Sequence, residues 1–330
     1  MRKILTALVL VASALLGMAV PSVMAADAPG SDAKIVIIVG ADTPQYLDDA
    51  DQLYAEAIKH TANVIKVYSP NATWAAVKEA TTGANVVIYL GHGNGWPSPY
   101  TYDPNYTTKD GFGLNATAAG THYNLKYYGE PYIRQLALAP GAVVFLHHLC
   151  YASGNSEPGG AAPSLSVAKQ RADNFATAFL AAGASVVIAD GHSHSGYYLN
   201  ALFTTTQTLG DLWRGAPNYH GHDIAYTPTR STGQAVLDPD TGGSSPAGYY
   251  RSIVGNLDFI TTKVIGIKGP PGVVGEPGVS VAPARTGGTT EGAAMPRALQ
   301  SGTTVSRYRG PRISVSTATL RRSTAPATLK

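Results

Sequence analysis

The sequence predicts an α/β fold in which a mostly parallel β-sheet carries helices on both faces. Five short runs of apolar, largely β-branched residues predict strands, and segments with helical spacing follow these runs in alternation. The runs are apolar throughout instead of alternating with polar residues, which is typical of parallel strands buried on both faces. Together these observations predict one three-layer α/β domain.

The expected strands are the runs 34–42, 63–69, 85–95, 141–150 and 185–191. The expected helices are the segments 43–61, 71–84, 130–140, 166–184 and 195–217. Thr43 is the predicted N-cap of the first helix, with Pro44 at its first position. Thr73 or Asn71 caps the second helix, which Gly83 ends. Residues 218–266 are expected to add loops and short strands.

Composition divides the chain into three parts. Residues 1–25 combine Arg2 and Lys3, an apolar stretch and small residues at Val23 and Ala25, the layout of a secretory signal peptide. The α/β domain is expected over residues 32–266, with its core in 34–190 and a completing segment in 191–266. We therefore expect a secreted or cell-envelope protein whose mature chain begins near Ala26. The alternative for the first segment is an uncleaved membrane anchor, and no later stretch is long and apolar enough to span a bilayer.

Residues 267–330 form a basic segment rich in Gly, Pro, Ser and Thr, with few large apolar residues. Such a composition buries too little surface to offset chain entropy, which predicts a disordered tail. Its scattered arginines suggest contact with an anionic cell surface, and a plain solvated extension is the alternative. The formal net charge of the whole chain is only +3, so its bulk charge does not indicate a nucleic-acid partner.

Cys150 is the only cysteine among 330 residues, and it lies where an apolar strand opens into a turn. In an exported protein a single thiol has no intramolecular disulfide partner and is open to oxidation. It is either a small buried side chain or a nucleophile at the edge of the sheet.

Functional crevices of open parallel sheets lie beyond the carboxyl ends of the strands. Asp42, His92, Cys150 and Asp190 all lie at such ends. His92 and Cys150 follow successive strands, which a right-handed crossover places side by side. A histidine within hydrogen-bond reach of a cysteine is the minimum machinery of a thiol hydrolase, because the imidazole promotes thiolate formation and then protonates the leaving group.

Three motifs in this order resemble the caspase–haemoglobinase fold of cysteine peptidases, which includes caspases, gingipains, clostripain and CHAT domains. They are VVIYLGHGNG (86–95), VVFLHHLCYASG (143–154) and FATAFLAAGASVVIAD (175–190). The resemblance covers residues 34–190 and implies that His92 is the general acid/base and Cys150 the nucleophile. It also implies that the backbone N–H groups of Gly93 and Cys150 form an oxyanion hole. The chain departs from the family pattern at Leu149, where a small residue is usual, and in the long insertion 96–130.

The same resemblance places the pocket for the residue before the scissile bond at the tips of the first and fifth strands and in the turn after Cys150. The chain offers Asp42, Asp190 and Glu157 there. Acidic side chains in this pocket select Arg or Lys through charge-assisted hydrogen bonds. We therefore expect a peptide or protein substrate with a basic residue at this position. In the alternative, Asp42 caps a helix and Asp190 supports a turn.

Two other classes of function stay open. His192 and His194, with Asp190 or Asp223, have ligand types and spacing that suit Zn²⁺ or Cu²⁺, which predicts a metal-dependent hydrolase in place of the dyad. Alternatively, the domain is a catalytically inactive binding module on the cell surface, because a fold does not imply activity. The favoured thiol mechanism needs no cofactor, and the sequence does not decide whether Ca²⁺ is required.

Overall fold

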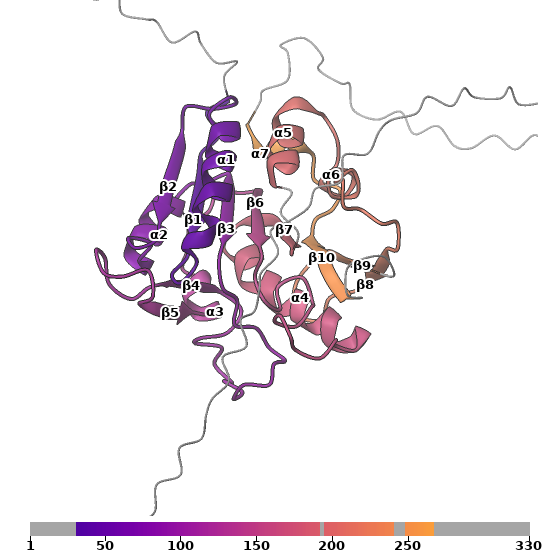
Figure 1. Cartoon of the computed structure of the whole chain (residues 1–330). Helices are drawn as coiled ribbons and strands as arrows, with labels where there is room; N and C mark the ends of the chain where they lie inside the picture. Colours follow the sequence, from indigo (N-terminus) through magenta and orange to yellow (C-terminus); the bar gives the residue numbers. More distant parts are fainter. Residues whose placement is uncertain (1–30, 192–194, 241–247, 267–330) are drawn as a thin grey trace, which may run out of the picture. The chain divides into compact units, whose positions relative to one another are not determined.

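The computed structural model describes residues 31–191, 195–240 and 248–266. All of them belong to the first of the two units into which the chain divides, Met1–Val273. The second unit, Val274–Lys330, lies outside the described residues, and so do the predicted signal peptide and tail, which Figure 1 draws as a grey trace.

The centre of the domain is an eight-stranded sheet, which confirms the predicted α/β class (Figure 1). In spatial order its strands are β2 (Val64–Tyr68), β1 (Ile35–Val39), β3 (Val86–Leu90), β6 (Ala142–His147), β7 (Ala184–Asp190), β10 (Gly248–Gly255), β9 (Gln234–Asp240) and β8 (Ile224–Tyr226). The first five are parallel and correspond to the five predicted strands. The last three pair antiparallel and extend the sheet from β7.

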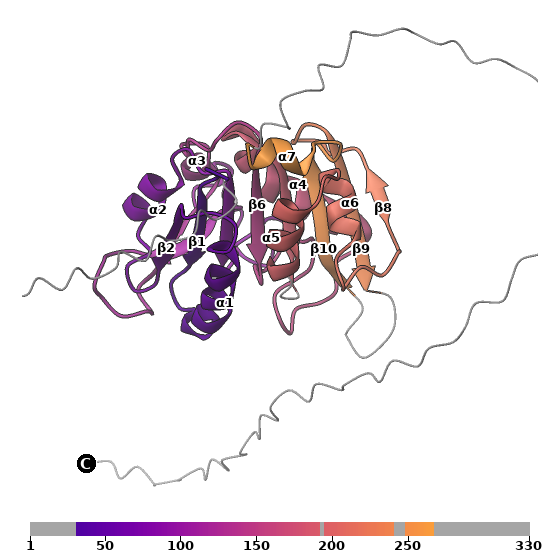
Figure 2. The same cartoon turned by 90° about the horizontal axis from the view of Figure 1, so that it is seen from above.

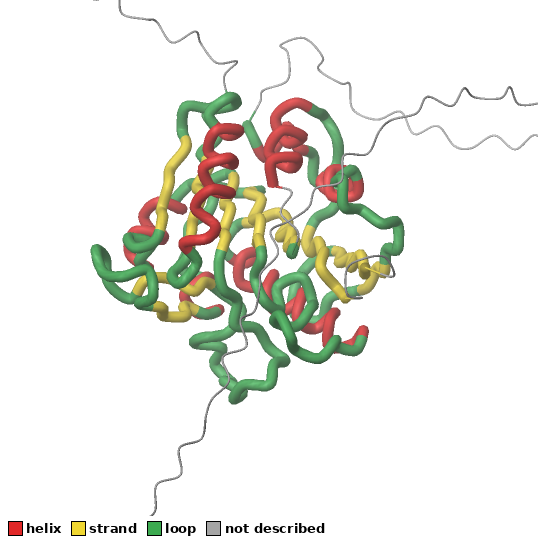
Figure 3. The backbone as a smooth tube through the Cα atoms, viewed as in Figure 1, coloured by secondary structure: helices red, strands yellow, loops and turns green. Residues whose placement is uncertain are grey.

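Helices cover both faces of this sheet (Figures 2 and 3). One face packs against α1 (Leu47–Ala57), α5 (Ser195–Thr204), α6 (Leu209–Arg214) and α7 (Thr261–Val264). The other packs against α2 (Trp74–Thr81), α3 (Glu130–Ile133), α4 (Leu165–Ala181) and the hairpin of β4 (Phe112–Asn115) and β5 (Leu125–Tyr128). Successive residues of β1 enter opposite cores, so Val36 lies in one and Ile37 in the other. This two-sided burial explains why the strand sequences are apolar throughout.

Three expectations about helices need correction. The segment 130–140 forms only the short α3, and its later residues are not helical, with the N–H of Leu138 bonded to the carbonyl of Ala182. The segment 195–217 divides into α5 and α6, because the Thr208 side chain accepts the N–H of Asp211 and begins a new helix. Thr43 makes no side-chain cap, since its hydroxyl donates back to the carbonyl of Gly40 at 2.6 Å.

Other details agree with the expectations. Thr73 caps α2 by accepting the N–H of Ala76, and Gly83 follows the helix with a left-handed φ of 69°. A 3₁₀ turn, η1 (Pro44–Tyr46), precedes α1. In the described part of the chain, no helix has the length and apolar character needed to cross a bilayer.

Candidate active site

The loops that follow β3 and β6 touch at Gly93 and Cys150. The two strands are parallel neighbours, with Leu90 in register with His147. A Cβ built on Gly93 would lie 2.2 Å from the carbonyl oxygen of Cys150 and 3.0 Å from its nitrogen. Only a residue without a side chain fits this approach, so the glycine lets the two strand ends come into backbone contact.

This contact places two backbone N–H groups beside the sulfur. The N–H groups of Cys150 and Gly93 are directed at Sγ and favour its thiolate form. Neither donates to a backbone or side-chain oxygen within the described residues. Two N–H donors that point at the nucleophile and at no oxygen match the arrangement that an oxyanion hole requires, and they are the two predicted for it.

The thiol itself is half-buried and is protonated in the resting state. Burial is the largest influence and raises the pKa of Cys150 above its ordinary value, and the negative charge of Glu157 raises it further. The two backbone N–H groups lower the pKa, but by less than burial raises it. At neutral pH the free chain therefore holds a weakly nucleophilic thiol.

His92 lies at the same edge of the sheet, and its imidazole faces Asp42. Its Nε2 lies 3.8 Å from Oδ2 of Asp42, and both side chains are more than one-third exposed. The structure records no hydrogen bond between the imidazole and Sγ of Cys150. The buried Tyr89 hydroxyl lies within hydrogen-bond distance of the carbonyl oxygens of Gly113, at 2.9 Å, and His92, at 3.1 Å, and so joins this loop to β4. The predicted dyad thus shares one rim, with the imidazole turned toward Asp42.

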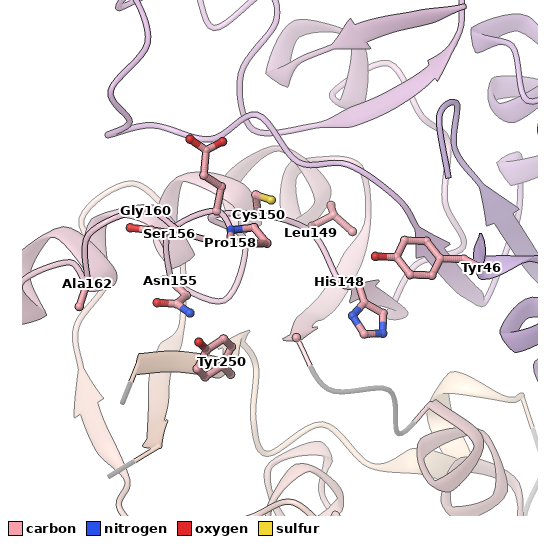
Figure 4. Close-up of a pocket in the computed structure, with 13 residues that line it drawn as sticks. Tyr46, His148, Leu149, Cys150, Asn155, Ser156, Pro158, Gly160, Ala162 and Tyr250 are labelled. Atoms are coloured by element: carbon pink, nitrogen blue, oxygen red, sulfur yellow. The ribbon is translucent and has the colours of Figure 1, made fainter. Parts of the chain in front are cut away.

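A pocket of about 530 Å³ opens on the other side of Cys150 (Figure 4). Figure 4 shows His148 and Tyr46 at one end of it, the segment from Asn155 to Ala162 at the other, and Tyr250 on a third side. The rings of Tyr46 and His148 stack at 4.9 Å and form a flat wall. Cys150 therefore lies on the wall of a concave site large enough for a side chain of a substrate.

Glu157 is the one predicted acid that lines this pocket. The Tyr100 hydroxyl donates to its two carboxylate oxygens, at 2.8 and 3.1 Å. This bond joins the insertion to the loop after Cys150. The sequence supplied Glu157 as a candidate but held no signal for its partner, which lies 57 positions away.

Asp42 and Asp190 do not line the pocket. Asp42 lies at the end of β1 and faces His92. The carboxylate of Asp190 is buried, and Arg251, Tyr198 and Asn218 all donate to it. Its role in the described part of the chain is structural, because it helps to hold β7, β10 and α5 together.

The alternative metal ligands are only partly described. His192 and His194 lie outside the described residues. Asp223 pairs with Arg214 at 2.7 Å and Asp190 pairs with Arg251, so each carboxylate already has a cationic partner. Among the described residues, no group of three or more His, Cys, Asp or Glu side chains has the arrangement to hold a metal ion.

Arg171 of α4 ties together the two loops that flank Cys150, and sequence reasoning missed it. Its buried guanidinium donates to the carbonyl of Pro97 at 2.6 Å in one loop. In the other loop it donates to the carbonyl of Asn155 and to Oγ of Ser156, each at 3.1 Å. Asn174, one turn further along α4, donates to the carbonyl of Trp96. Charged residues of an amphipathic helix usually face solvent, so only the folded chain reveals this role.

Two residues close to the thiol have a strained backbone. His148 and Tyr151 on either side of Cys150 have φ values of 54° and 73°, which bulky L-residues rarely adopt. Asp42, at the end of β1, has a φ of 61°. Such conformations persist where the surrounding structure imposes them, and they are enriched at functional sites.

The rim thus combines a half-buried thiol, two N–H donors directed at it, an imidazole and a pocket with one carboxylate. These are the components of acyl transfer to a cysteine. No family model, curated protein or solved structure matches the chain.

Proposed function

We propose that the chain is a secreted thiol hydrolase of the cysteine-endopeptidase type, similar to enzymes of the caspase–haemoglobinase fold. The observation that supports it best is the contact between Gly93 and Cys150. This contact presents two N–H donors, directed at no backbone or side-chain oxygen of the described residues, beside the only sulfur nucleophile at the wall of a pocket.

In this proposal the Sγ thiolate of Cys150 attacks the carbonyl carbon of a peptide bond and forms a C–S bond. The carbonyl oxygen becomes an oxyanion that accepts hydrogen bonds from the N–H groups of Gly93 and Cys150. His92 takes the thiol proton and donates it to the leaving amine as the C–N bond breaks. Water then hydrolyses the thioester, releases the acid and restores the thiol.

His92 must turn from Asp42 toward the sulfur for this sequence of steps. Asp42 and His92 are solvent-exposed, and their nearest carboxylate and imidazole atoms lie 3.8 Å apart. The interaction free energy of an exposed ion pair of this kind is at most about 1 kcal/mol. The imidazole is therefore free to rotate when a substrate arrives. Asp42 remains behind it as a partner that stabilises the imidazolium form.

Glu157 supports a preference for a basic residue before the scissile bond. It is the one carboxylate among the described residues of the pocket wall, and a carboxylate selects Arg or Lys by charge-assisted hydrogen bonds. A series of fluorogenic peptides that differ only at this residue tests the preference. Faster cleavage after Arg or Lys is expected, and faster cleavage after Asp or Ala would contradict it.

The experiment that tests the hydrolase uses two thiol reagents. A peptidyl-arginine chloromethyl ketone is expected to alkylate Cys150 quickly, because binding brings the electrophile to the thiol. Iodoacetamide, which has no binding element, is expected to react slowly because the resting thiol is protonated. Intact mass measures both reactions, with Cys150→Ala as the blank and His92→Ala expected to slow the ketone. Equal rates for the two reagents would contradict the proposal.

Export is the second part of the proposal, and it rests on the signal-peptide pattern of residues 1–25. Expression in a secreting host is expected to release a chain that begins near Ala26. N-terminal sequencing of the secreted product measures this, and a retained Met1 would indicate an anchor instead.

A second candidate function is a binding module that uses the same pocket without chemistry. The raised pKa of Cys150 and the orientation of the His92 imidazole toward Asp42 favour it. Such a module would bind basic peptides with equal affinity in the native chain and in Cys150→Ala, and it would form no adduct with the ketone. The two-reagent experiment separates the candidates.

A further inference from the structure

Tyr100 of the insertion is hydrogen-bonded to Glu157, which lines the pocket that contains Cys150. The hydroxyl of Tyr100 donates to both carboxylate oxygens of Glu157, at 2.8 and 3.1 Å. The two residues belong to different loops, one in the insertion and one after Cys150. Tyr100 is 52 % exposed, so solvent reaches this hydrogen bond and a ligand can replace the hydroxyl.

The pocket is complementary to a cation. Glu157 is the only carboxylate among the described residues that line it. Aromatic rings of Tyr46 and Tyr250 lie on its other walls, and such rings also attract cations. A planar guanidinium or an ammonium group would replace one neutral hydroxyl at the carboxylate with a charge-assisted, bidentate contact.

We propose that a guanidinium or ammonium ligand displaces Tyr100 from Glu157 and, by neutralising that carboxylate, converts Cys150 from a resting thiol to a reactive thiolate. The inference rests on the proposed function for its biological meaning, but the ligand response itself needs no catalysis. It assigns Tyr100 as the residue that occupies the cation site in the free chain. It also assigns Glu157 two tasks, since the carboxylate recognises the ligand and suppresses the thiol until the ligand is bound.

The groups that face the sulfur support this coupling. Cys150 interacts electrostatically with four residues from different parts of the fold. They are Tyr46 of η1, Tyr100 of the insertion, Tyr127 of β5 and Glu157 of the loop after Cys150. His148 and Tyr250 line the same pocket, and His92 and Asp42 lie at the adjoining rim. The guanidinium of Arg171 interacts with Glu157 and with Tyr151 from beneath the loop.

Glu157 dominates this set at neutral pH. The tyrosines are neutral there, because burial raises the pKa of Tyr46 and of Tyr127, and the bond to Glu157 raises that of Tyr100. Asp42 already has an imidazole beside it. Glu157 is therefore the negative charge whose neutralisation has most effect on the sulfur, and its charge is among the causes that raise the thiol's pKa.

The single cysteine makes the test direct. The chain is labelled with [¹³Cβ]cysteine, which gives one resonance, and its chemical shift is followed against pH at constant ionic strength. Agmatine is the guanidinium probe, and N-butylurea is its uncharged counterpart. With agmatine bound, the thiolate fraction at pH 8 is expected to rise at least about threefold, the change that half a pKa unit produces. N-butylurea is expected to leave the titration unchanged.

Two substitutions locate the effect. Glu157→Gln is expected to lower the titration midpoint without a ligand and to abolish the agmatine response. Tyr100→Phe keeps the ring but removes the competing hydroxyl, so it is expected to tighten agmatine binding at least about twofold. Glu79→Gln, which removes an exposed carboxylate from α2, is the matched control and is expected to behave like the native chain.

The inference is overturned if agmatine leaves the titration midpoint of Cys150 unchanged or raises it. It is also overturned if agmatine shifts this midpoint equally in the native chain and in Glu157→Gln. If Glu157→Gln does not fold, Tyr100→Phe still decides, because weaker or unaltered agmatine binding excludes a competing hydroxyl. The outcome is separable from that of the proposed function. A ligand response without peptide cleavage supports this site alone, and cleavage without a ligand response supports only the hydrolase.

Discussion

Gly93→Ala is the most informative single substitution, because it adds one methyl group at the contact between the two strand ends. The new Cβ would lie 2.2 Å from the carbonyl oxygen of Cys150. An ordinary van der Waals separation requires this contact to lengthen by about 1 Å, and the opposing atoms are backbone that has no rotamer to change. The φ of Gly93 is not among the positive ones, so the substitution is steric and not conformational.

The shift has two measurable consequences. Overpacking of this kind costs about 1–3 kcal/mol of stability, which urea unfolding measures. A displacement of about 1 Å would also remove the Gly93 N–H from the proposed oxyanion position, where one donor would contribute about 3 kcal/mol to the transition state. We therefore expect kcat/KM for a basic peptide to fall roughly 100- to 1,000-fold.

Gly196→Ala is the matched control. A Cβ at Gly196 meets nothing within 4 Å, and the residue lies in α5, where alanine favours the helix by about 0.5–1 kcal/mol. This variant is expected to be as active as the native chain and at least as stable. If Gly93→Ala kept its stability and cleaved within threefold of the native rate, the two strand ends would not be in contact as described, and the oxyanion assignment would be wrong.

Three further predictions follow from the site and its support. Arg171→Ala is expected to loosen both loops that flank Cys150, so amide hydrogen exchange should accelerate in 93–99 and 150–158 and labelling by the chloromethyl ketone should slow. The control Gln170→Ala, at an exposed position of α4, should change neither rate. The rate at which iodoacetamide alkylates Cys150 is expected to rise with pH through a midpoint above that of a free cysteine, because a raised pKa leaves less thiolate at any lower pH. A midpoint at or below that of a free cysteine would contradict the assignment of a protonated thiol in the resting state. Arg251→Met removes the guanidinium from the buried Asp190 and Asp238 and is expected to lower the free energy of unfolding in urea by about 3–5 kcal/mol. Arg214→Met, at the exposed pair with Asp223, is expected to lower it by less than about 1 kcal/mol. Similar losses would refute the distinction between a buried and an exposed ion pair.

The strands and their ends were predictable from sequence because their signal is local. Burial on both faces requires apolar residues at every position of β1, β3 and β6, and this requirement is visible in a window of five or six residues. Parallel connections with one handedness then placed His92 and Cys150 at one edge. The contact of Gly93 with Cys150 follows from that placement and from the absence of a side chain.

The pocket was less predictable because its contacts join distant segments. Three acids were equal candidates in the sequence, and the fold distinguished them by burial and by partners. Asp190 forms an ion pair with Arg251, 61 positions away, and Asp42 lies beside the imidazole of His92 on the neighbouring loop. The bond between Tyr100 and Glu157 depends on the course of a long insertion, which has no periodic pattern to predict it.

The order of the strands also gives the proposed substrate a direction across the rim. Asp42 and His92 follow β1 and β3, the two neighbouring strands between which the strand order of the sheet reverses. Functional crevices of open α/β sheets typically lie at this point. Cys150 follows β6, the next strand, and the pocket extends from there to Gly191 after β7. A peptide laid along these ends would place its leaving amine near His92 and its acyl side over the pocket.

This arrangement requires the side chain before the scissile bond to enter the pocket with Glu157, while the side chain after the bond passes toward β1. Substitution of the residue before the bond should therefore change kcat/KM far more than substitution of the residue after it. Glu157→Gln should reduce only the first dependence, because it alters the pocket and leaves the β1 side intact. If the residue after the bond controlled the rate instead, the peptide would run the other way, and His92 would lie too far from the amine to protonate it.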